Sequence, residues 1–156
     1  MGELATSPKK REKILKLQGS ISKEIESGEL EAYDPDVVHH FAPGLYAREC
    51  HLNAGSIVVG KIHKHAHINT ISKGKVRVFT EFDDEVLEYE APCTFTSIPG
   101  SKRAVYAIED TIWTTYHPTD KTDLESIEDE VIAPSYEDFE IHICYEQKKM
   151  LEENEK

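Results

Sequence analysis

The sequence predicts an all-β fold, an antiparallel sandwich or barrel with short helical additions at both ends of the chain. One observation is a series of short apolar-alternating segments between residues 45 and 116, separated by turn signals such as Lys73-Gly74 and Pro99-Gly100. The other is three histidines at alternate positions, His63, His65 and His67. Side chains two residues apart in a strand point to the same face, so we expect three imidazoles to line one site inside a β structure.

Length and charge limit the function. A chain of 156 residues has room for one domain with a sizeable core. Its formal net charge of −12 repels phosphate backbones, so no nucleic-acid partner is expected. No apolar run approaches the roughly 20 residues that span a bilayer, and no apolar secretion segment opens the chain. We therefore expect a soluble cytoplasmic protein with no membrane partner. The three cysteines form no CxxC pair, which argues against a disulfide scaffold or a cysteine-built zinc site.

Residues 1–43 are predicted to form an N-terminal helix and an approach segment. Ser7-Pro8 begins the helix, Ser27-Gly28 ends it, and apolar residues recur between them at helical spacing. Residues 31–44 hold prolines and a glycine and are predicted to be irregular, which would place His39 and His40 in a loop.

Residues 44–118 are predicted to form the β-barrel. The candidate strands are Leu45–Leu52, Ser56–His63, Ile68–Ser72, Lys75–Phe82, Val86–Tyr89, Cys93–Ile98, Arg103–Ile108 and Thr111–Tyr116.

Residues 119–156 are predicted to be an acidic C-terminal helix and tail. The sequence Thr122-Asp123-Leu124-Glu125 is a capping box that would begin a helix ending near Ile132. Residues 139–143 alternate apolar and polar side chains, which predicts an added strand that exchanges with a second subunit.

The arrangement resembles the cupin family of double-stranded β-helix (jelly-roll) barrels, and more narrowly the small cupin-type proteins encoded in phage genomes. The first cupin motif is Gly, five residues, His-x-His, three or four residues, Glu, six residues, Gly. Here Gly55 and Gly74 enclose Lys61, His63 and His67 at the same spacing. The second motif has Pro-x-Gly, two residues, then His; here it reads Ile98-Pro99-Gly100-Ser101-Lys102-Arg103.

Three departures from these motifs bear on metal binding. Lys61 and Arg103 stand where the family has metal-binding histidines, and His67 stands where it has glutamate. Lysine binds a cation only when deprotonated, and arginine stays protonated. The motif positions therefore supply two ligands, His63 and His67. A third would have to come from His65, His117 or His39.

The first functional interpretation is a pocket for a small polar or anionic molecule. Lys61, Arg103 and the histidines would make an electropositive barrel interior, and Tyr106 would supply a wall. The competing interpretation is that Lys61 and Arg103 neutralise carboxylates such as Glu49 or Glu81.

The second interpretation is a metal-dependent enzyme, with one divalent ion (Fe, Mn, Ni or Zn) on His63, His67 and a third histidine. The resemblance implies oxygenase, isomerase or epimerase chemistry, and a metal-free variant would pair His63 with Tyr106 or Tyr116. The third is a non-catalytic oligomeric scaffold, such as a virion component. The sequence favours the ligand-binding barrel, as a homodimer with its site at Lys61, His63, His65, His67, Arg103 and Tyr106, and it leaves catalysis open.

Overall fold

A computed structural model describes residues 8–80 and 85–155 of the chain. Within these ranges the elements are α1 (Pro8–Ser27), β1 (Asp36–Ala42), β2 (Leu45–Leu52), β3 (Ile57–Val59), β4 (Ile62–His63), β5 (His67–Lys73), β6 (Lys75–Thr80), β7 (Leu87–Glu90), β8 (Cys93–Ser97), β9 (Arg103–Ala107), β10 (Thr111–Pro118), α2 (Leu124–Val131), β11 (Ile132–Ala133) and α3 (Tyr136–Asn154). No helix in these ranges is long and apolar enough to cross a membrane.

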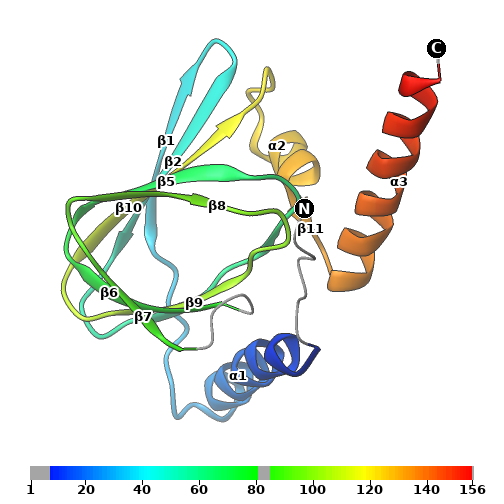
Figure 1. The fold of residues 1–156 in the computed structure, drawn as a ribbon. Helices are drawn as coiled ribbons and strands as arrows, with labels where there is room; N and C mark the ends of the chain where they lie inside the picture. The colour runs from blue at the N-terminus through cyan, green and yellow to red at the C-terminus, as the bar shows by residue number, and fades with distance from the viewer. Residues whose placement is uncertain (1–7, 81–84, 156) are drawn as a thin grey trace.

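Two antiparallel sheets form the barrel (Figure 1). One has the strand order β1-β2-β10-β5-β8, and the other has the order β3-β9-β6-β7. A short pair, β11 with β4, joins the chain after α2 to the barrel. Most neighbours in these sheets are distant in sequence, which is the interleaved strand order of a double-stranded β-helix. The predicted all-β fold with helical additions is confirmed.

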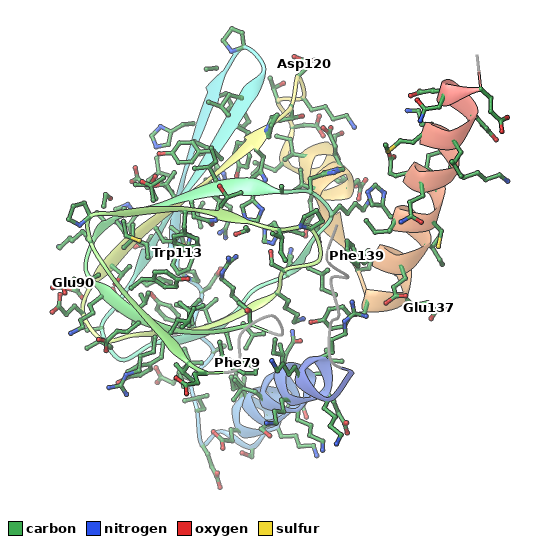
Figure 2. The ribbon with its side chains drawn as sticks, in the orientation of Figure 1. Phe79, Glu90, Trp113, Asp120, Glu137 and Phe139 are labelled. Atoms are coloured by element: carbon green, nitrogen blue, oxygen red, sulfur yellow. The ribbon has the colours of Figure 1, made fainter. Side chains whose placement is uncertain are left out.

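The core lies between the two sheets. Its largest fully buried apolar residues are Ile71, Val76 and Val78, and Trp113 points into the same space with 7% of its surface exposed (Figure 2). Inward side chains alternate along each strand, as the apolar alternation of the sequence predicts.

One buried polar network crosses the first sheet. The Trp113 indole N–H donates to Asn69 Oδ1 at 3.0 Å, and Asn69 Nδ2 donates to Ser97 Oγ at 2.7 Å. Buried polar groups need such partners because each unpaired one costs stability. The network ties β10, β5 and β8 together.

Two predictions for the first half of the chain need correction. The predicted irregular segment 31–44 contains β1, a seven-residue strand paired with β2, so His39 and His40 lie on a strand. The predicted strand Ser56–His63 is split at Gly60 and Lys61 into β3 and β4. The reason is a change of partner: β3 pairs with β9, whereas β4 pairs with β11.

The C-terminal elements also differ from expectation. Helix α2 is capped by Asp123, whose carboxylate accepts from Ser126 N, rather than by Thr122. The exchanged strand predicted at residues 139–143 is wrong, because these residues lie within α3. Ser135 caps α3 by accepting from Asp138 N, and Phe139 lies buried where the helix meets the barrel (Figure 2). Phe139 and Ile143 are four residues apart and share one helix face, whereas Ile141 is exposed, and the cap favours the helix.

Candidate functional site

Three histidines from three strands meet inside the barrel, and we call them the three-histidine cluster: His63, His67 and His117. His63 ends β4, His67 begins β5, and His117 lies near the end of β10. The ring centroids of His63 and His67 are 4.3 Å apart, those of His67 and His117 are 5.0 Å apart, and those of His63 and His117 are 5.6 Å apart. His67 and His117 are 4% and 5% exposed. The fold therefore gathers three imidazoles away from water.

Burial keeps this cluster uncharged. It lowers the pKa of His63 to about 3 and that of His117 to about 4, and it lowers the pKa of His67. The neighbouring histidines and the charge of Arg103 lower the pKa of His63 further. Imidazole is costly to protonate in such surroundings, so all three rings are neutral near pH 7.

Backbone carbonyls orient two of the rings. His63 Nδ1 lies 3.4 Å from the Ser101 carbonyl oxygen, and His67 Nδ1 lies 3.3 Å from the His65 carbonyl oxygen. A carbonyl accepts only, so each Nδ1 carries the proton and each Nε2 keeps its lone pair. His67 Nε2 is buried and has no hydrogen-bond partner within the described residues. The cluster thus holds a buried lone pair that receives no hydrogen bond from any donor in residues 8–80 and 85–155.

Tyr46 on β2 forms the wall next to His117. The two residues are opposite each other in the β2–β10 register, and their rings stack with centroids 6.2 Å apart. The Tyr46 hydroxyl lies 2.7 Å from His39 Nδ1, and burial raises the Tyr46 pKa, so the phenol stays protonated. Sequence reasoning missed Tyr46, since only the strand register brings it to His117.

Of the two cations predicted for the site, Lys61 and Arg103, only Arg103 lies close to the cluster. It begins β9, and its charge lowers the pKa of both His63 and His67. Its guanidinium carbon lies 5.3 Å from the ring centroid of Phe95 and 6.0 Å from that of Trp113, so the aromatic core holds it in place.

Two of the predicted site residues lie away from the cluster. Lys61 is exposed and pairs with Glu128 of α2. Tyr106 is 40% exposed and alternates with the core residues Val105 and Ala107, so it faces outward. Lys61 therefore neutralises a carboxylate, but that carboxylate is neither of the two named from the sequence. Glu49 instead hydrogen-bonds His40 and His51, and Glu81 lies outside the described residues.

His65 also lies away from the cluster, although it stands between two of its members in the sequence. Residues 64–66 leave the strand between β4 and β5, and this breaks the expected alternation. The His65 ring instead meets that of His142 on α3, with centroids 5.3 Å apart, and His65 Nε2 lies 3.2 Å from the Glu130 carbonyl oxygen.

The donor atoms of the cluster fit a divalent transition metal, but their present orientation does not. Neutral imidazoles are suitable ligands for zinc, iron and nickel, and the unpaired His67 Nε2 is a free donor. Yet within residues 8–80 and 85–155 no three His, Cys, Asp or Glu side chains are arranged to hold a metal ion. The His63 and His117 rings are stacked within 8° of parallel.

Comparison with known proteins bears on the fold. No protein-family model matches the chain, and no curated protein matches its sequence significantly. Among solved structures, ectoine synthase from P. lautus is similar, with a TM-score of 0.53 and 11% identity over 68% of this chain and 79% of that one. A cupin superfamily protein from Desulfitobacterium hafniense has a TM-score of 0.45 and 11% identity over 60% and 87% of the two chains. An uncharacterised double-stranded β-helix protein from Klebsiella pneumoniae has a TM-score of 0.49 and 13% identity over 60% and 84%. The interleaved strand order shows a double-stranded β-helix fold, and the similarity to the ectoine synthase structure concerns the fold alone.

Proposed function

We propose that the three-histidine cluster binds one divalent transition metal ion and that the loaded site takes a small polar or anionic molecule. The observation that carries the proposal is three neutral imidazoles, two buried and one half-buried, with ring centroids 4.3–5.6 Å apart, and His67 Nε2 unpaired within the described residues. Burying an unpaired polar atom is costly unless it acquires a partner. A metal ion would supply that partner to all three rings.

His63, His67 and His117 would be the protein ligands, and Tyr46 would lie beside them. Three histidines leave coordination positions open, where a bound ion would act as a Lewis acid on an oxygen-containing ligand. Because no three donor side chains of the described residues are arranged to hold an ion, the proposal includes a rotation of the rings when the ion binds. Fe, Mn, Ni and Zn are all candidates, since imidazole alone does not select among them.

The charge of the site favours a polar or anionic ligand. A divalent ion and the Arg103 guanidinium would give the site positive potential, which favours carboxylates and other anions. The protonated Tyr46 hydroxyl supports the same assignment, since it can donate a hydrogen bond. Whether a reaction follows binding is a separate question. Of the two tyrosines suggested as an acid partner for His63, Tyr106 faces outward and Tyr116 alternates with the inward His117.

Calorimetric titration of chelator-treated protein with Zn²⁺ and Ni²⁺ tests the metal site. We expect one ion per chain, and a loss of affinity of about 100-fold or more for His67→Ala and for His117→Ala, since even indirect partners of a metal contribute about 10–100-fold. His65→Ala is the matched control, because it removes an imidazole from the same segment outside the cluster. No binding, or one-to-one binding that survives both cluster substitutions, would reject the site.

The ligand part is tested with oxalate and inorganic phosphate as probes. We expect either anion to raise the melting temperature more in the metal-loaded protein than in the chelator-treated protein, because binding to the native state stabilises it. An equal rise in both would show that the anion does not use the ion.

We also propose that the chain is a homodimer. β1 is an edge strand of the five-stranded sheet, and it exposes Val38 and Phe41 at 45% and 46%. An apolar edge strand is a template for pairing with another chain. A solution mass near 35 kDa by light scattering, twice the 17.7 kDa of one chain, would support the dimer, and a monomer mass would reject it. A cytoplasmic location and a phage origin stay predictions.

A further inference from the structure

A pocket on the outside of the barrel is separate from the three-histidine cluster. It is bounded by α1, by α2 with the segment that follows it, and by the chain around Gly60. Its volume is about 410 Å³, within the range of small-molecule sites. It is lined by Gln18, Val59, Gly60, Lys61, Ile62, Lys102, Glu128, Asp129, Ile132, Ala133 and Pro134. None of the three clustered histidines lines it, so it can be tested independently of the metal site.

Lys102 is the unusual residue of this pocket. Its side chain lines the cavity while the residue is only 7% exposed, and it forms no ion pair within the described residues. Its Nζ atom donates to the neutral Gln18 Oε1 at 2.8 Å. Lys61, at the same pocket, is exposed and paired with Glu128. Lysines are almost never buried without a carboxylate partner, so the environment of Lys102 calls for an explanation.

The surroundings of Lys102 favour the neutral amine. Burial lowers its pKa, and burial is the cause of the shift. The lining supplies mainly apolar surface near it, from residues such as Ile62, Ile132 and Ala133. A desolvated lysine of this kind is the form in which an amine acts as a nucleophile toward carbonyl compounds.

We propose that Lys102 is an amine nucleophile that forms an imine with a small aldehyde or ketone bound in this pocket. The Nζ lone pair attacks the carbonyl carbon, and the oxygen accepts a proton to give a carbinolamine. Loss of that hydroxyl as water leaves a carbon–nitrogen double bond to Lys102, and no oxidant or reductant is needed. Glu128 and Asp129 line the same pocket and are the carboxylates available to carry the protons.

Reductive trapping of the full-length protein tests the proposal. Butanal is the probe, with cyanoborohydride to fix the imine at pH 7, followed by peptide mapping over time. An exposed lysine is neutral to only about one part in two thousand at this pH. We expect Lys102 to be alkylated at least about tenfold faster than the exposed Lys61 and Lys121 of the same molecules. A Lys102 rate equal to or below theirs overturns the proposal, and this comparison needs no variant.

Two variants separate reactivity from a purely structural role. Gln18→Glu places a carboxylate next to the amine, which favours the ammonium by one or more pKa units, so alkylation of Lys102 should slow about tenfold or more. Gln147→Glu is the matched control, because it makes the same change at an exposed residue of α3 that does not line the pocket, and it should leave the Lys102 rate unchanged. If Gln18→Glu leaves the alkylation rate unchanged while the circular dichroism spectrum is native, the reactivity of Lys102 does not depend on its neutral form as proposed.

Discussion

The imidazole rings of His63 on β4 and His117 on β10 lie 5.6 Å apart and within 8° of parallel. His117 is buried and His63 is half-buried, so both rings carry a proton only at a high cost, since each charge would be poorly hydrated and would face a like charge. This relationship makes the stability of the metal-free protein depend on pH.

The first prediction is a loss of stability below pH 6.5 in the presence of a chelator. The folded pKa values of His63 and His117 are about 3 and about 4, whereas the ordinary value is 6.5. Between pH 6.5 and about 4 these two histidines bind protons in the unfolded chain but not in the folded chain. The free energy of unfolding therefore falls as the pH falls. Each histidine contributes a slope of about 1.4 kcal/mol per pH unit in this window.

Urea unfolding at several pH values between 6.5 and 4.5 measures this slope. His117→Gln should reduce it by about 1.4 kcal/mol per pH unit, because the amide takes up no proton. An equal slope for the His117 variant and the unsubstituted protein would show that His117 is not held neutral.

The second prediction concerns the buried network around Asn69. Replacing Asn69 with Leu leaves the Trp113 N–H without its acceptor and removes the donor to Ser97 Oγ. We expect the free energy of unfolding to fall by about 1–3 kcal/mol, the cost of an unsatisfied buried group. Thr70→Val on the same strand is the control, because its bond to Thr94 lies at the surface and should cost less. Equal losses in urea unfolding would contradict the network's role.

The third prediction concerns the two motif glycines. Gly55 and Gly74 have φ values of +85° and +94°, which side chains disfavour by about 1–2 kcal/mol. A Cβ on Gly74 would lie 2.4 Å from the Asp110 carbonyl oxygen, whereas one on Gly55 would have no atom within 4 Å. Gly74→Ala should therefore destabilise the protein clearly more than Gly55→Ala. Melting temperatures of the two variants measure the difference, and similar losses would mean that the backbone near Asp110 yields easily.

Local patterns predicted most of the strands because each strand is recognised by its own alternation. The segment at residues 45–52 is predicted with its observed ends, and the glycines of both motifs lie in turns with positive φ. The errors arise where the structure of a segment depends on pairing, capping or packing partners outside that segment. β1 is a strand because β2 pairs with it, and residues 139–143 are helical because Ser135 caps them and Phe139 finds a buried position.

The sequence by itself determined the short antiparallel strands of a sandwich or barrel and the inward direction of His67, since alternation and turn chemistry act over a few residues. Only the tertiary structure chose His117 over His65 as the third imidazole, because this depends on where β10 lies beside β5 and on the break after His63. It also placed Lys102 beside Gln18, a contact between residues with no local relationship. Such contacts depend on the register and packing of distant segments, which no short stretch of sequence encodes.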